Sequence, residues 1–88
     1  MLRVTRSHMN GSIESLRVEG RLTRRDVPRF QEACAELLDG GRSLHLDLAG
    51  LQFADREAVA TLQALRRRGV ALVGASGFLD ALLAEPTR

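Results

Sequence analysis

The chain has 88 residues, the length of one domain and near the lower end of what builds its own core. Its hydrophobic fraction of 44% is typical of a folded protein rather than a disordered one. Because Trp and Tyr are absent, Leu, Val and Ala must form most of the core. The formal charge of only +2 argues against nucleic-acid binding, which favours a basic face carrying aromatic side chains. We therefore expect one domain over residues 1–88 that binds no nucleic acid.

Three features predict a cytoplasmic protein. The lone cysteine excludes an internal disulfide and fits a reducing compartment. Residues 1–15 carry Arg3, Arg6 and Glu14 in place of the apolar core of a signal peptide. No stretch approaches the ~20 apolar residues that span a membrane, so we expect no membrane insertion.

The first half of the chain predicts a β-hairpin followed by a helix. Residues 2–6 and 13–22 alternate between apolar and polar side chains, and Asn10-Gly11 between them is a strong turn signal. Thr23 is a candidate helix cap, with an aspartate three residues later in the Glu position of a capping box. Apolar side chains then recur at helical spacing until two glycines, at 40 and 41, end the helix.

The second half alternates strands with helices. A strand is predicted at residues 43–49, and a helix capped by Asp55 at residues 55–68. The next strand, at residues 70–74, is a continuous apolar run, which suits a strand that is buried on both sides or shielded by helices.

A last helix follows a cap at Ser76 and ends at Pro86. Its predicted inward-facing side chains are Phe78, Leu79, Leu82 and Leu83. The element order β-β-α-β-α-β-α predicts an α/β fold with a small mixed sheet, in which an opening hairpin precedes right-handed parallel crossovers.

The helix at residues 55–68 has two different faces. On a helical wheel, one arc should pack on the sheet, and it holds Ala58, Val59, Leu62 and Leu65. The opposite arc holds Glu57, Ala60, Thr61, Ala64 and Arg68. Its small side chains suit a docking surface for a partner, although Ala is also simply the best helix former on a solvated face.

Catalytic and metal-binding patterns are missing. The sequence has neither Lys nor Tyr, and no glycine-rich phosphate loop. Cys34 lies on the inner face of the first predicted helix, which favours a structural thiol over a nucleophile. His8, His45 and this cysteine lack the spacing of zinc ligands. We expect a non-enzymatic protein that needs no cofactor and no metal.

Three motifs follow one another at residues 18–22 (Val-Glu-Gly-Arg-Leu), 46–55 (Leu-Asp-Leu-x-x-Leu-x-Phe-x-Asp) and 67–74 (Arg-Arg-Gly-Val-x-Leu-Val-Gly). With the element order, they resemble a STAS domain, the family of the anti-sigma factor antagonists, over about residues 12–83. The resemblance implies a regulatory module that docks a kinase-fold anti-sigma factor through the N-terminal part of the helix at 55–68, with the loop of residues 22–26 beside it. Family members usually carry one more strand and helix, so the chain is C-terminally short by comparison.

The family signature is Asp-Ser-Ser-Gly or a close variant, and the hydroxyl residue before Gly is phosphorylated to break the complex. Here the matching residues are Asp55, Arg56, Glu57 and Ala58. The resemblance therefore implies that position 57 cannot be phosphorylated. Glu57 is either a fixed acidic stand-in for the phosphoryl group or part of a docking surface without a switch. A purely structural role is also open, because carboxylates stabilise the first turn of a helix.

The resemblance implies a partner-binding surface that comprises Thr23, Asp55, Arg56, Glu57, Ala58, Ala60, Thr61 and Ala64. The partner is an anti-sigma factor with a kinase fold or, alternatively, the ATPase of a lipid-transport ABC transporter. A third alternative is a sensor of a small ligand such as a nucleotide or an acyl chain. If no strand covers the edge beside residues 70–74, a homodimer through that edge is also possible.

Overall fold

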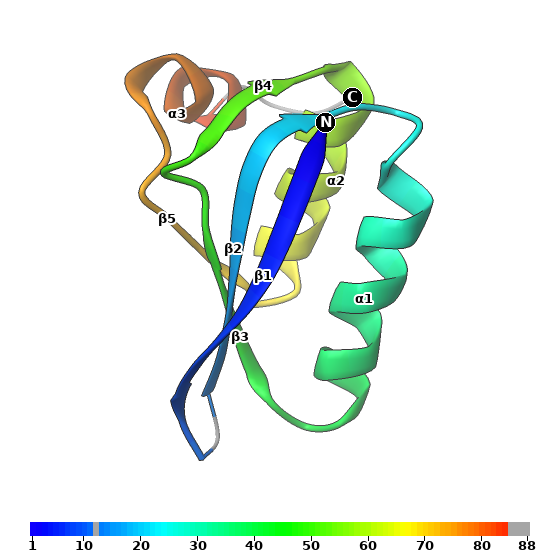
Figure 1. Ribbon diagram of the computed structural model, residues 1–88, viewed down its shortest axis with the longest axis vertical. Coiled ribbons are helices and arrows are strands. Elements are labelled where there is room, and N and C mark those ends of the chain that lie inside the picture. The colour runs from blue at the N-terminus through cyan, green and yellow to red at the C-terminus, as the bar shows by residue number, and fades with distance from the viewer. Residues whose placement is uncertain (12, 85–88) are drawn as a thin grey trace.

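In the computed structural model, which describes residues 1–11 and 13–84, strand β2 (Ile13–Leu22) lies at the centre of a five-stranded sheet (Figure 1). Strand β1 (Leu2–Asn10) pairs with one edge of β2 in antiparallel fashion. The other edge of β2 pairs in parallel with β3 (Ser43–Asp47) and then with β4 (Leu51–Ala54). β5 (Ala71–Val73) pairs in parallel with β3. The predicted mixed sheet with an opening hairpin is confirmed.

The three helices are α1 (Val27–Asp39), α2 (Arg56–Arg67) and α3 (Gly77–Ala84). Figure 1 shows α1 and α2 on one side of the strands, and α3 packs against α2. All three predicted helices are therefore present in the predicted order. Pro86, the predicted end of the last helix, lies outside the described residues.

Alternation along β2 and β3 separates a buried face from a less buried one. The inward apolar side chains of these strands are leucines and a valine, and they meet buried side chains of all three helices in one core. From the strands this core includes Leu16, Val18, Leu22, Leu44 and Leu46. From α1 it includes Phe30 and Cys34, which confirms that the cysteine is on the inner face.

The sequence did not predict strand β4. The chain turns at Ala49 and Gly50, and Gly50 then accepts a hydrogen bond from the backbone N–H of Gly20 (3.0 Å). A Cβ at position 50 would lie 2.7 Å from the side chain of Glu19, so the close approach requires glycine. Four residues are too few to display a clear alternation, and the strand exists because the long β2 offers it a partner.

Some local features differ from expectation. Of the two alternatives for the strand at residues 70–74, burial on both sides is excluded, because β5 is an edge of the described sheet and Val73 is 45% exposed. Phe78 does not face inward and is 63% exposed. The hairpin turn begins at Gly11 rather than Asn10, because Asn10 still pairs with Ile13.

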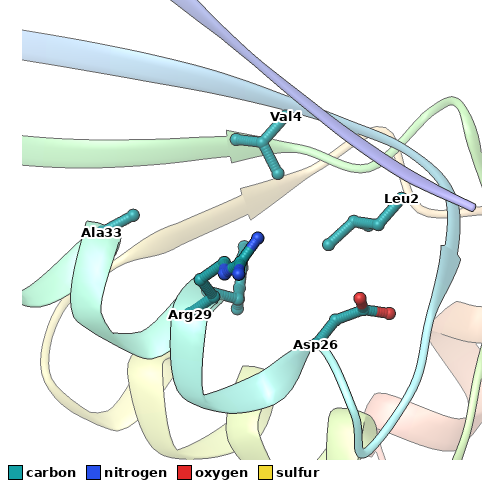
Figure 2. A pocket seen from close by; sticks show the side chains of 6 residues that line it. Leu2, Val4, Asp26, Arg29 and Ala33 are labelled. Atoms are coloured by element: carbon teal, nitrogen blue, oxygen red, sulfur yellow. The ribbon is translucent and has the colours of Figure 1, made fainter.

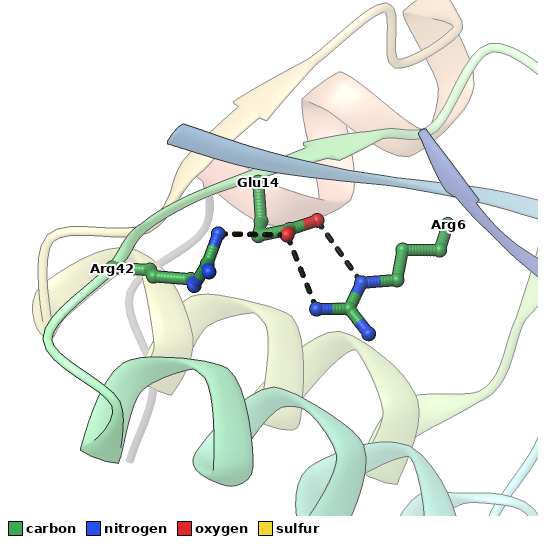
Figure 3. Close-up of polar contacts among 3 residues, drawn as sticks. All are labelled: Arg6, Glu14 and Arg42. Carbon is green, nitrogen blue, oxygen red and sulfur yellow. Dashed lines mark hydrogen bonds and ion pairs between the residues drawn. The ribbon is translucent and has the colours of Figure 1, made fainter. Parts of the chain in front are cut away.

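A buried carboxylate fastens the hairpin to the loop after α1 (Figure 3). Glu14 lies on the helix-facing side of β2, with 4% of its side chain exposed. Its two oxygens accept hydrogen bonds from Nε and Nη2 of Arg6 (both 3.1 Å) and from Nη1 of Arg42 (3.0 Å). The buried charge is thus paired, as burial of an ion requires.

Candidate functional site

The candidate site is built where two neighbouring parallel strands end. Leu22 at the end of β2 pairs with Ala54 at the end of β4. The backbone N–H of Asp55 donates to the carbonyl oxygen of Leu22 (3.2 Å). The loop that leads to α1 and the start of α2 are therefore side by side, although some thirty residues separate them in sequence.

Asp55 joins these two segments. Its backbone is extended (φ −78°, ψ −179°), and Oδ1 accepts a hydrogen bond from the N–H of Ala58 (2.9 Å), which confirms the predicted helix cap. Oδ2 accepts a second hydrogen bond from the backbone N–H of Arg24 (2.7 Å). One half-buried carboxylate thus caps α2 and also holds the loop of residues 23–26 against it.

Thr23 is not the cap of α1, contrary to the prediction. The helix begins at Val27 with Asp26 in the cap position, and no side chain makes a capping hydrogen bond there. The carboxylate of Asp26 instead accepts hydrogen bonds from the backbone N–H (3.3 Å) and the hydroxyl (3.1 Å) of Thr23. The capping-box pattern therefore closes a turn that precedes the helix.

The exposed side of α2 carries four of the predicted site residues. Arg56 and Glu57 are exposed in its first turn, and Ala60 and Ala64 follow on the same side. The helix N-terminus attracts negative charge, and Glu57 lies in its first turn. With the exposed Arg24 from the loop, these residues form the surface that we call the α2 docking face.

Two predicted members of this face are buried. Ala58 has 0% and Thr61 has 6% of its surface exposed, so neither side chain is available to a partner. The hydroxyl of Thr61 donates to the carbonyl oxygen of Glu57 (2.9 Å), one turn earlier in the helix. The helical wheel placed Thr61 on the outer arc, and this is wrong: the residue is buried, and the hydrogen bond holds its side chain against the helix.

The remaining reactive groups do not join the site. Burial raises the pKa of the Cys34 thiol to about 11, which suits a structural role. Within residues 1–11 and 13–84, no three His, Cys, Asp or Glu side chains are placed to hold a metal ion. No helix in the same ranges is long and apolar enough to cross a membrane.

Sequence reasoning missed the backbone of Arg24 as part of the site. The signal that could have found it is the parallel pairing of β2 with β4, since residues that follow adjacent parallel strands emerge at the same sheet edge. Without β4, Phe53 looked like a loop residue, and the resemblance placed Thr23 beside Asp55 without indicating which backbone group donates to the carboxylate.

Comparisons with known proteins agree with this architecture. The model of the family described as "Mlab, STAS domain" matches residues 6–85. The fold is similar to that of the anti-sigma factor antagonist SpoIIAA in its unphosphorylated form, with a TM-score of 0.74, 14% identity and coverage of 91% of this chain and 80% of that one. It is also similar to an uncharacterised protein with a SpoIIAA-like fold from Shewanella loihica PV-4, with a TM-score of 0.60, 15% identity and coverage of 88% and 69%. No curated protein matches the chain.

Proposed function

We propose that this chain, which belongs to the STAS domain family, binds a partner protein through the α2 docking face. In this role it acts in the cytoplasm as a regulatory module similar to an anti-sigma factor antagonist. The observation that carries the proposal is the double hydrogen bond of Asp55, from Ala58 and from Arg24. Because this carboxylate holds loop and helix together, the exposed residues on either side of it form one preorganised surface.

The chemistry of the docking face supports a protein ligand. Ala60 and Ala64 give the exposed side of α2 a low profile, so another backbone or helix can approach closely. Arg24, Arg56 and Glu57 surround this smooth strip with exposed charges of both signs. Charges at the rim of an interface mainly select the partner and orient it.

The proposal includes docking without a phosphorylation switch at position 57. Glu57 has no hydroxyl, and Thr61, the next hydroxyl along the helix, is buried and hydrogen-bonded. A kinase would therefore find no accessible hydroxyl on this part of α2. In this proposal Glu57 contributes charge complementarity in every state of the protein.

The test identifies the partner and then measures its affinity. Capture from the native host followed by mass spectrometry should return an anti-sigma factor with a kinase fold, whereas a transporter ATPase would assign the alternative partner class. Ala60→Trp should abolish partner binding, because the larger side chain blocks close approach. Ala81→Trp, at an exposed position of α3, should leave partner binding unchanged. Glu57→Arg should also abolish binding, with Glu32→Arg on the exposed side of α1 as its control. Unchanged affinity in both Ala60→Trp and Glu57→Arg, with folding verified by circular dichroism, would refute the proposal.

A further inference from the structure

A groove lies between β1 and α1, and none of the residues that line it belongs to the α2 docking face (Figure 2). Its volume is about 310 Å³, and it is partly open to solvent. Both elements line it with apolar side chains, and the start of α1 adds two charged groups: Leu2, Val4, Phe30 and Ala33, then Asp26 and Arg29. Figure 2 shows Leu2 and Val4 reaching from the strand toward the helix.

The groove runs along an open sheet edge. In the described part of the chain, β1 pairs with β2 alone. The N–H of Arg21 donates to the carbonyl oxygen of Met1 (3.1 Å), which makes these two residues a hydrogen-bonded antiparallel pair. Such pairs alternate along the ladder, so the N–H and C=O groups of Leu2 and Val4 point away from β2. An unpaired row of backbone groups beside an apolar groove is a template for another strand.

One positive charge in the groove has no ion-pair partner in the part of the chain that the structure describes. The carboxylate of Asp26 is occupied by the N–H and hydroxyl of Thr23. Arg29 forms no ion pair with any described residue, and Figure 2 shows its guanidinium pointing from α1 toward β1. A ligand strand that places a carboxylate opposite Arg29 would gain a charge-assisted hydrogen bond.

We propose that the β1 edge binds an extended segment of a partner protein by strand addition. Every second side chain of that segment enters the groove, with apolar groups against Leu2 and Val4 and an acidic group at Arg29. A partly open groove beside unpaired backbone groups fits successive side chains of a strand better than it fits one compact ligand. This surface is independent of the α2 docking face, so one partner chain could use both or two partners could use one each.

Charge argues against a second copy of this chain as the occupant. Residues 2–10 contain Arg3 and Arg6 and no acidic residue. Two such strands side by side would bring the arginines of both copies together. Arg6 is paired with Glu14, but no described residue forms an ion pair with Arg3, and like charges on facing strands are destabilising. The alternating apolar and acidic segment of a different protein avoids this repulsion.

The probe is the peptide acetyl-Val-Thr-Glu-Thr-Val-Thr-amide, titrated into the full chain by calorimetry. Replacing its Glu by Lys should weaken binding by about tenfold or more, because the paired charge is lost. Arg29→Glu should reverse this preference, and a glutamate in the first turn of α1 is compatible with the helix dipole. Arg68→Glu, the same charge change at the exposed end of α2, should leave the preference unchanged.

A second variant tests the backbone pairing. Val4→Pro removes an N–H that β2 does not use, and edge strands accept proline where the N–H faces solvent. It should abolish peptide binding, whereas Ala60→Trp should not affect it, which separates this surface from the α2 docking face. In the unmodified chain, peptide binding should slow hydrogen exchange at the amides of Leu2 and Val4, a readout that needs no substituted protein.

Several results would overturn the proposal. These are no binding up to about 1 mM peptide, equal affinity for the Glu and Lys peptides, and unchanged exchange at the two β1 amides. A concentration-dependent dimer that Val4→Pro dissociates would assign the edge to a second copy and would also overturn it.

Discussion

Removal of the Asp55 carboxylate tests how much one side chain contributes to the site. In Asp55→Ala, the N–H of Ala58 and the N–H of Arg24 both lose their acceptor. Loss of a helix cap costs about 0.5–2 kcal/mol, and loss of a hydrogen bond to a charged group costs about 1.5–3 kcal/mol. Asp55 is half-buried, so water replaces part of each bond. We expect the free energy of unfolding to fall by about 2–4 kcal/mol, a large share of the total for a small domain.

Asp55→Asn separates the two contributions. Asn caps a helix about as well as Asp, so the bond to Ala58 should persist while the amide group turns a donor toward the N–H of Arg24. The expected loss in urea unfolding is about 1–2 kcal/mol. Hydrogen exchange should become fast at Arg24 in both variants and remain slow at Ala58 in Asp55→Asn alone. Two results would show that the Asp55 carboxylate does not hold the loop against α2, as the proposed function requires. One is an Asp55→Asn variant as stable as the unmodified chain, and the other is a cost of under about 0.5 kcal/mol for Asp55→Ala.

Two further predictions concern groups away from the docking face. Glu14→Gln should lower the free energy of unfolding by about 1–3 kcal/mol, because the bonds from Arg6 and Arg42 lose their ionic acceptor; Glu32→Gln on the exposed side of α1 should change it by less than about 0.5 kcal/mol. Stability should also fall by about 1 kcal/mol between pH 8 and pH 10, because the unfolded Cys34 thiol, with a pKa near 9.0, loses its proton before the folded thiol, whose pKa is about 11. With no Lys or Tyr in the chain to titrate in this range, Cys34→Ala should remove the decrease, and an equal decrease in that variant would disprove its assignment to the thiol.

The sequence was sufficient to predict the helices and the sheet class, because their signals are local. The α2 cap is such a signal, since Asp55 followed by an apolar period of 3.6 specifies a helix start before any tertiary contact forms. The sequence did not predict strand β4 or the exposure of Val73, because these features are not set by local signals. Both depend on which strand lies beside another, and pairing is decided by the whole sheet rather than by a short run of residues.

The candidate site divides in the same way. Its exposed residues, Arg56, Glu57 and Ala60, follow from helical periodicity. The hydrogen bond between the Asp55 carboxylate and the N–H of Arg24 does not follow from periodicity, because it forms only through the parallel pairing of Leu22 with Ala54. The β1 groove was missed for a related reason, since it requires two elements that become neighbours only in the folded chain.

The sign of one substitution decides between the two interpretations of Glu57. Glu57 lies in the first turn of α2, which Asp55 caps, and its side chain is exposed. If the carboxylate imitates a phosphoryl group that repels the partner, Glu57→Gln should strengthen partner binding by removing the negative charge. If it complements a positive group on the partner, Glu57→Gln should weaken binding, and the effect should shrink as salt rises. We expect weaker binding, by roughly twofold to fivefold, because exposed ion pairs contribute about 1 kcal/mol or less. Stronger binding by Glu57→Gln at low salt would instead show that position 57 holds the module in its released state.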